Sequence, residues 1–223
     1  LYTVRRQLVE TIQAHTNMSV PEAEARALAL LTEVGIPAAE SRMDAYPHQF
    51  SGGMRQRVVI ALALCAEPEL VIADEPTTAL DVSVQAQVIG VLKRLCEERG
   101  TAVMLITHDM GVIAEAADRV MVLYSGRIME DGAAQEVIHR PKHPYTVGLM
   151  GSIPKLGADI DRLVQIPGSM PRINAIPPGC PFHPRCEKRF EPCDTLRPDP
   201  IPVGATRVGC WLYDETKTAG AAA

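Results

Sequence analysis

The chain has 223 residues, 47% hydrophobic and 22% charged, a composition that is ordinary for a soluble globular protein. Its formal net charge of −5 excludes the basic surface that nucleic-acid binding requires. The longest strongly apolar run, Val58–Ala66, is far shorter than the ~20 residues of a membrane-spanning helix. The first residues also lack the charged flank and apolar stretch of a signal peptide, so any membrane attachment is expected to go through a partner.

The first 50 residues are predicted to be mainly helical. Ser19 and Glu22 have the spacing of a capping box, in which the two side chains satisfy backbone donors at a helix start. Apolar residues then recur at helical spacing until Gly35, which is typical of a helix end. We therefore expect a helical subdomain over residues 1–57.

Apolar strands alternate with helices from about Val58 to Arg140, which indicates an α/β unit with a parallel sheet over residues 58–140. The strands at 70–73 and 102–106 are apolar enough to be buried. The expected elements are, in chain order, a helix at 58–66, a strand at 70–73, a helix at 82–98 that ends at Gly100, a strand at 102–106, a helix at 110–117, and short strands at 119–123 and 127–130.

The alternation stops beyond Arg140. Thirteen of the eighteen prolines fall within residues 141–202, which predicts a small irregular module, residues 141–223, held together by something other than a large core. Four of the six cysteines lie in this module: Cys180, Cys186, Cys193 and Cys210. Such clustering in a chain without a secretory signal favours metal binding over disulfides.

Two adjacent acids, Asp74 and Glu75, follow the predicted strand at 70–73. Ligands of open α/β sheets bind beyond the carboxyl ends of the strands, where these acids stand. Because neighbouring strand residues point to opposite sides, the two carboxylates can take different roles. One can hold Mg²⁺, and the other can orient or deprotonate a water that attacks phosphorus. For the pair alone, two solvated acids at a strand end are an equally good explanation.

Polar residues near the ends of other predicted elements favour the catalytic explanation of the two acids over two solvated acids. Ser51, Gly52 and Gly53 stand before a predicted helix, where bare backbone amides suit an anion, although two glycines alone usually mean a tight turn. Asp81 is placed to cap the next predicted helix. His108 follows the second predicted strand, but a lone histidine of this kind is more often structural than catalytic.

In this order the motifs resemble those of the ATP-binding-cassette (ABC) family, over residues 1 to about 132. The resemblance is carried by the signature motif at 50–57, with Met54 where glutamine is commonest, the Walker B strand at 70–76, the D-loop at 79–81 and the switch histidine His108. It implies an α/β fold: a partial RecA-like parallel sheet of an ABC nucleotide-binding domain, with a helical subdomain and a small irregular cysteine-rich C-terminal module.

The resemblance also implies the site residues of an ATPase. Asp74 would bind Mg²⁺ through water, Glu75 would polarise the attacking water, and His108 would sense the γ-phosphate. The residues that would contact the nucleotide of a partner subunit, with the D-loop, are Ser51, Gly52, Gly53, Met54, Gln56 and Asp81.

Two motifs of the family are absent from the sequence, the phosphate-binding loop and the glutamine loop. Phosphate binding needs G-x-x-x-x-G-K-[S/T], and no Gly-Lys pair followed by serine or threonine occurs in these residues. The family carries this loop and its glutamine loop before the stretch where this chain begins, so we expect a chain truncated just past them. Alone, it should neither bind ATP tightly nor hydrolyse it, and unpaired sheet edges should make it poorly stable.

A His-Pro-Tyr motif at 143–145 resembles the start of the C-terminal extension in the oligopeptide/dipeptide branch of importers, and the cysteine-rich segment fits the same extension. The resemblance implies an ATP-hydrolysing subunit that drives uptake of oligopeptides or dipeptides. One alternative is an ABC ATPase subunit that drives uptake of nickel or another solute. The other is a fragment without catalytic activity that binds metal and has a regulatory role. Chromosome-maintenance ATPases share the signature and Walker B motifs, but their coiled-coil arms are not visible in this sequence.

The four C-terminal cysteines follow the spacing C-x5-C-x6-C-x16-C, without the C-x2-4-C pairs of structural zinc sites. Four thiolates can hold an iron–sulfur cluster, and the resemblance points to [4Fe–4S]; zinc, free thiols and disulfides stay open. His183 lies between two of the cysteines and could replace one as a ligand, but a role beside the ligands or at the surface is the favoured interpretation. Cys65 and Cys96 stand among apolar helical residues and are expected in the core.

The resemblance implies partners as well. Membrane permease subunits would receive the motion of the helical subdomain, and a second ABC ATPase, identical or homologous, would complete the nucleotide sites. An extracytoplasmic peptide-binding protein would act indirectly. The chain is therefore expected at the cytoplasmic face of the cell membrane, as a peripheral subunit.

Overall fold

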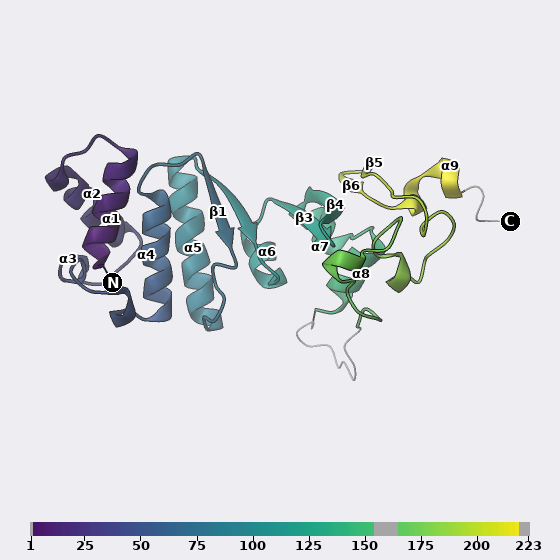
Figure 1. Ribbon diagram of the computed structural model, residues 1–223, viewed down its shortest axis with the longest axis horizontal. Helices are drawn as coiled ribbons and strands as arrows, with labels where there is room; N and C mark the ends of the chain where they lie inside the picture. Colours follow the sequence, from purple (N-terminus) through teal and green to yellow (C-terminus); the bar gives the residue numbers. More distant parts are fainter. Residues whose placement is uncertain (1, 154–164, 219–223) are drawn as a thin grey trace. The chain divides into compact units, whose positions relative to one another are not determined.

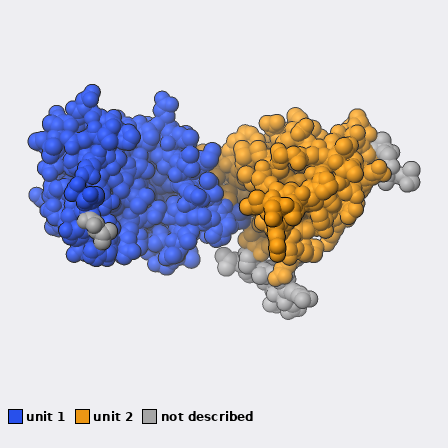
Figure 2. Space-filling view, viewed as in Figure 1, with its two compact units in different colours: residues 1–112 blue, residues 113–223 orange. Residues whose placement is uncertain are grey.

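The computed structural model describes residues 2–153 and 165–218. It divides into two compact units, residues 1–112 (unit 1) and 113–223 (unit 2), shown in Figure 2. The three-segment division expected from the sequence stays a prediction. Within the described ranges, no helix has the length and apolar character needed to span a bilayer.

Unit 1 is largely helical, and the prediction that its first 50 residues are mainly helical is confirmed. Its helices are α1 (Val4–His15), α2 (Val20–Glu33), α3 (Ala39–Arg42), the 3-10 helix η1 (Pro47–Gln49), α4 (Gly52–Leu64) and α5 (Val82–Arg99). The predicted capping box is confirmed, because a carboxylate oxygen of Glu22 accepts a hydrogen bond from the N–H of Ser19 at 2.8 Å. Gly100 adopts a left-handed conformation (φ 66°) and ends α5, also as predicted.

Four helices enclose the core of unit 1. Figure 1 shows α4 and α5 side by side. The fully buried large side chains of this core come from α1, α2, the C-cap of α2, α4 and α5: Val4, Leu8, Ile12, Leu30, Leu31, Val34, Leu64, Val88 and Leu95. Cys65 and Cys96 lie in this core, which confirms that prediction, and burial raises the pKa of both thiols.

Unit 1 also holds a two-stranded parallel sheet, β1 (Leu70–Asp74) and β2 (Ala102–Ile106), paired from Leu70↔Ala102 to Asp74↔Ile106. Both strands were predicted, but the expectation that they are buried is wrong. Val71 packs on the helical core, whereas Ile72 is 62% and Met104 is 52% exposed. Successive strand residues point to opposite faces, and only one face of this sheet is covered by described elements.

Unit 2 is built on a four-stranded antiparallel sheet in the order β3-β4-β6-β5. Its strands are β3 (Arg119–Tyr124), β4 (Arg127–Ala133), β5 (Ile201–Val203) and β6 (Thr206–Val208). The two strands predicted at 119–123 and 127–130 exist, but their assignment to a parallel sheet is wrong. Ser125 and Gly126, both with positive φ, turn the chain back so that β3 and β4 form a hairpin.

Short helices surround this second sheet. They are α7 (Ala134–His139), α8 (Pro144–Gly151), α9 (Glu215–Thr218) and the 3-10 helices η2 (Ile173–Ala175), η3 (His183–Arg185) and η4 (Trp211–Tyr213). The boundary between the units falls within α6 (Met110–Ala116). The predicted irregular structure is confirmed for residues 165–200, where the structure describes only the short 3-10 helices η2 and η3. It is wrong for residues 201–208, which contribute β5 and β6 to the sheet.

An aromatic cluster and one arginine hold the irregular segment of unit 2. The rings of Tyr124, Tyr145 and Phe182 contact one another, with centroids 4.7 to 5.4 Å apart. The guanidinium of Arg185 donates to the hydroxyl of Tyr124 and to the carbonyl oxygens of Ile166 and Pro167. These contacts fix the end of β3 and the chain around residue 166 to the segment that carries the cysteines.

Candidate functional site

The carboxyl ends of β1 and β2 bring Glu75 and His108 together. The two strands run parallel and end in register at Asp74 and Ile106, so the residues that follow them share one edge of the sheet. The N–H of Glu75 donates to the carbonyl of Ile106 at 2.8 Å. Nδ1 of His108 lies 2.7 Å from Oε1 of Glu75, and the Thr78 hydroxyl donates to Oε2 at 3.2 Å.

The two side chains shift each other's pKa in opposite directions. The hydrogen bond from His108 lowers the pKa of Glu75, and the hydrogen bond to Glu75 raises the pKa of His108. The side chain of His108 is 84% exposed and that of Glu75 is 36% exposed, so solvent screens the attraction. At neutral pH Glu75 is therefore an ionised acceptor that is open to a ligand or a water.

Glu75 does not continue the strand. Its φ is 47°, in the left-handed region that non-glycine residues rarely adopt, whereas Asp74 is still a strand residue. The different roles expected for the two acids therefore rest on a change of backbone conformation, not on strand alternation. Such strain clusters at functional sites, where surrounding contacts hold it in place.

Asp109 is a polar residue of this edge that the sequence analysis did not single out. Its carboxylate accepts from the side-chain amide of Gln85 at 2.7 Å and from the N–H groups of Gly111 and Val112 at 2.8 and 3.2 Å. The hydrogen bond from Gln85 is the main cause of its lowered pKa. An aspartate directly before a predicted helix was the available signal. Asp109, the residue after His108, is therefore tied to α5 through its hydrogen bond with Gln85.

The signature residues occupy the start of α4. Ser51 is the N-cap, and its hydroxyl accepts from the N–H of Met54 at 3.4 Å. Gly52 and Gly53 lie inside the first turn of α4, and not before the helix as expected. Met54 and Gln56 follow in the same helix and are half-buried.

The two glycines are required by the packing of α4. A Cβ on Gly52 would stand 3.0 Å from Cδ2 of Leu80, and one on Gly53 would collide with the side chain of Val84. Asp81, between these partners, caps α5 as predicted by accepting from the N–H of Val84 at 2.9 Å. The signature glycines and the D-loop are thus packed together.

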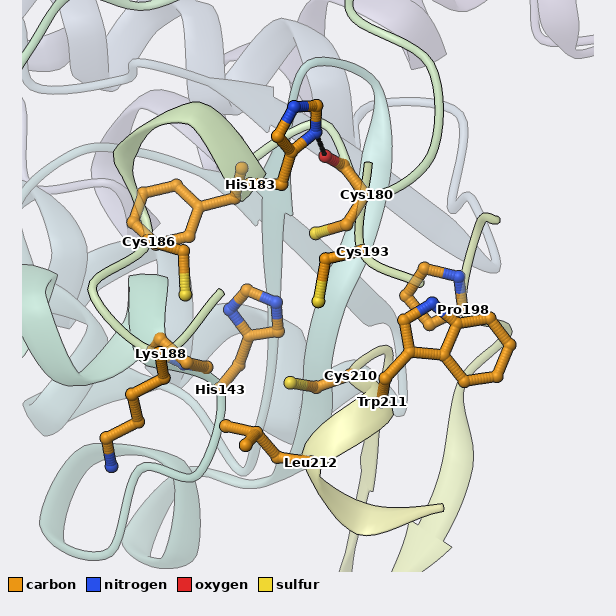
Figure 3. Close-up of a pocket in the computed structure, with 12 residues that line it drawn as sticks. His143, Cys180, His183, Cys186, Lys188, Cys193, Pro198, Cys210, Trp211 and Leu212 are labelled. Atoms are coloured by element: carbon orange, nitrogen blue, oxygen red, sulfur yellow. Dashed lines mark hydrogen bonds between the residues drawn. The ribbon is translucent and has the colours of Figure 1, made fainter. Parts of the chain in front are cut away.

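The four C-terminal cysteines line one pocket in unit 2, and Figure 3 shows their sulfur atoms directed into it. All four are free thiols. Burial raises the pKa of Cys180 and Cys186, and raises that of Cys210 to about 12. Without a cation the thiols of Cys180, Cys186 and Cys210 therefore stay protonated at neutral pH, whereas bound metal favours thiolates.

The backbone of the cysteine segment gathers these thiols. The N–H of Cys180 donates to the carbonyl of Cys193 at 2.8 Å, and Gly179 before it has a φ of 70° that favours glycine. Across the described ranges, no group of three or more His, Cys, Asp or Glu side chains is close enough together to hold one metal ion. The pocket therefore brings the thiols together without forming a single-ion site.

Two histidines line the same pocket. Nδ1 of His183 lies 2.9 Å from the carbonyl oxygen of Cys180, and Figure 3 shows its ring turned away from the sulfur atoms. This orientation fits the non-ligand role favoured from the sequence better than a role as a substitute ligand. His143 is 1% exposed and its ring lies among the sulfur atoms in Figure 3. Burial lowers its pKa to about 4. The His-Pro-Tyr motif was its sequence signal, but the motif did not indicate contact with the cysteines.

Two family patterns match the chain. The pattern described as ABC transporter matches residues 2–78, and the one described as oligopeptide/dipeptide transporter, C-terminal region, matches residues 129–193. Among solved structures, the dimeric ATP-binding cassette MJ0796 bound to ADP and Pi is similar, with a TM-score of 0.53 and 32% identity over 60% of this chain and 57% of that one.

Curated relatives are similar over most of the chain. The oligopeptide transport ATP-binding protein AppD of Bacillus subtilis is 49% identical over 96% of this chain, and OppD of Haemophilus influenzae is 50% identical over 95%. OppD of Escherichia coli is 49% identical over 87%. The chain spans 65%, 66% and 58% of the lengths of these three proteins. With the motifs, the cassette-like fold and both patterns in agreement, the chain belongs to the ABC transporter ATPases of the oligopeptide/dipeptide importer family.

Proposed function

We propose that the chain is part of the ATP-hydrolysing subunit of an importer for oligopeptides or dipeptides. The observation that carries this proposal is the Glu75–His108 contact at the carboxyl edge of the parallel strands. The printed names of the relatives, oligopeptide and dipeptide transport ATP-binding proteins, support the cargo class. A nickel-importing ATPase is the alternative that a cargo assay would separate.

In this role the two acids act at one edge of the sheet. Asp74 would hold Mg²⁺ through water, and the ionised Glu75 would accept a proton from the water that attacks the γ-phosphorus. His108, hydrogen-bonded to Glu75, contacts the γ-phosphate and keeps that carboxylate oriented. Ser51, at the positive start of α4, would contact the nucleotide that a second subunit holds. The other residues of this chain that would contact that nucleotide are Gly52, Gly53, Met54, Gln56 and Asp81.

The partners follow from this arrangement. A second ATPase subunit supplies the nucleotide that the signature residues contact, in line with the dimeric state of the similar cassette. Residues 1–57 transmit closure to membrane permease subunits, 58–140 form the ATPase core, and 141–223 form the extension. The subunit lies at the cytoplasmic face of the membrane, and an extracytoplasmic binding protein delivers the peptide.

The cysteine pocket is proposed to hold a [4Fe–4S] cluster on Cys180, Cys186, Cys193 and Cys210. Four unpaired thiols, three buried and that of Cys186 half-buried, line one pocket and fit this donor set, and their arrangement does not suit one zinc ion. When bound, the cluster supplies four metal–thiolate bonds that cross-link the irregular segment at 180–193 to residue 210.

Phosphate release from MgATP tests the ATPase role. These 223 residues contain no G-x-x-x-x-G-K-[S/T] loop, so the purified chain alone should show no turnover. In an importer whose subunit joins this chain to a G-x-x-x-x-G-K-[S/T] loop and is assembled with permease and second ATPase, Glu75→Gln should abolish peptide-stimulated hydrolysis and leave ATP binding intact. Turnover by the isolated chain, or unchanged hydrolysis in the assembled variant, would overturn the assignment of roles.

Metal analysis tests the cluster separately. Anaerobically purified protein should contain about four irons and four sulfides per chain, with absorption near 400 nm, and little zinc. Stoichiometric zinc would show that the pocket binds zinc and not an iron–sulfur cluster, and it would not affect the ATPase assignment. If the protein contained neither iron, sulfide nor zinc, the proposal that the pocket binds metal would be wrong.

A further inference from the structure

His143 presents one unpaired nitrogen at the cysteine pocket. Its side chain is almost completely buried, at 1% exposure, and it lines the pocket with all four cysteines (Figure 3). Its Nε2 is buried and, among the residues that the structure describes, has no hydrogen-bond partner. Buried polar atoms are normally paired, so an unpaired one in a pocket of possible ligands calls for a partner that binds there.

The other ring nitrogen determines what Nε2 can do. Nδ1 of His143 accepts a hydrogen bond from the N–H of Tyr145 at 3.0 Å, as the N-cap of α8. An accepting Nδ1 carries no proton, so the proton of the neutral imidazole is on Nε2. Nε2 is then a donor without a free lone pair, which excludes it as a metal ligand unless the ring becomes an imidazolate.

The backbone of the motif is held so that the ring stays in place. The buried carboxylate of Glu130 accepts from the N–H of Lys142 at 3.0 and 3.1 Å and from the N–H of His143 at 2.9 Å. The hydroxyl of Tyr213 donates to the carbonyl of Lys142 at 2.9 Å, and the His143 ring packs against Phe182 with centroids 5.9 Å apart. The donor is therefore pre-positioned by contacts from β4, η4 and the cysteine segment.

We propose that Nε2–H of His143 donates a hydrogen bond to a sulfur atom of the group that the four cysteines hold. The proposal rests on the proposed [4Fe–4S] cluster, whose thiolates and sulfides are acceptors. His143 is a positioning residue in this role and not a ligand. A hydrogen bond to cluster sulfur stabilises the more negatively charged reduced state, so this contact raises the reduction potential of the cluster.

The test is a redox titration of the anaerobic, cluster-loaded protein with dithionite, followed by absorption and EPR. His143→Asn removes the Nε2 donor but keeps a side-chain oxygen to accept from Tyr145, since asparagine is a favoured N-cap. The reduction potential should shift to more negative values, with iron and sulfide contents unchanged. The control His183→Asn removes an imidazole from the same pocket and should leave the potential at the wild-type value.

A second measurement does not depend on the variant's folding. In ¹⁵N-histidine-labelled wild-type protein, pulsed EPR of the reduced cluster should detect one coupled histidine nitrogen and an exchangeable proton that is lost in D₂O. A loaded cluster with no such coupling, or with an unchanged potential in His143→Asn, overturns this inference and leaves the cluster standing. Wild-type protein without iron and sulfide overturns both the cluster and the inference.

Discussion

Oε1 of Glu75 lies 2.7 Å from Nδ1 of His108, and this contact joins the residues that follow two parallel strands. The two are 33 positions apart in the sequence, and the register of β1 against β2 brings them together. The left-handed backbone of Glu75 and its N–H bond to Ile106 aim the carboxylate at the imidazole. The pair therefore reports whether the edge of the sheet is correctly formed.

The pH dependence of this pair has a definite sign. The raised pKa of His108 contributes stability that is present below its unfolded value of 6.5 and is lost as pH rises through the folded value. The lowered pKa of Glu75 contributes stability that is present above 4.5 and is lost as pH falls through the folded value. NMR titration should therefore give His108 a pKa above 6.5 that falls in Glu75→Gln. Equal values in both proteins would contradict the contact.

Gly53→Ala tests the contact between α4 and α5. The added Cβ collides with the β-branched side chain of Val84, and overpacking of this kind costs about 1–3 kcal/mol of unfolding free energy. Gly90→Ala is the matched control, because its Cβ meets open space on α5 and alanine favours a helix by about 0.5–1 kcal/mol. Urea unfolding followed by circular dichroism should show opposite shifts. Equal shifts would contradict the close approach.

Asp81→Ala tests the cap of α5. The carboxylate accepts from the N–H of Val84, and loss of an N-cap acceptor costs about 0.5–2 kcal/mol. Asp81→Asn keeps an oxygen acceptor and should retain most of the stability. If denaturant unfolding gave the two variants the same loss, the charge of Asp81, and not its hydrogen bond, would be the stabilising feature.

Gly179→Ala tests how the cysteine pocket is held. The position has a left-handed backbone, and an added Cβ would collide with the carbonyl of Cys193. We expect the buried thiols of the metal-free protein to react several-fold faster with a thiol reagent. Gly204→Ala is the control, since it shares the positive φ but its Cβ meets nothing within 4 Å. Similar reaction rates in the two variants would mean that backbone strain alone, and not the collision, opens the pocket.

Local signals in the sequence were sufficient for most elements of unit 1. The capping box at Ser19, the cap at Asp81 and the stop at Gly100 each act within about four residues, so a linear reading captures them. The clustering of four cysteines in the last part of the sequence predicted a shared site, and the four line one pocket. The extent of burial of β1 and β2 was misjudged, because apolar composition does not say which face of a strand another element covers.

By itself, the sequence determined the order of the main helices and strands up to about residue 130, the family and the candidate residues, because these depend on neighbouring side chains and on motif spacing. Only the tertiary structure decided that β4 pairs with β6, that Glu75 leaves the strand to meet His108, and that His143 faces the cysteines. Each of these relationships joins segments that are far apart along the chain. Their geometry follows from packing and backbone pairing across the fold, which no local period or spacing specifies.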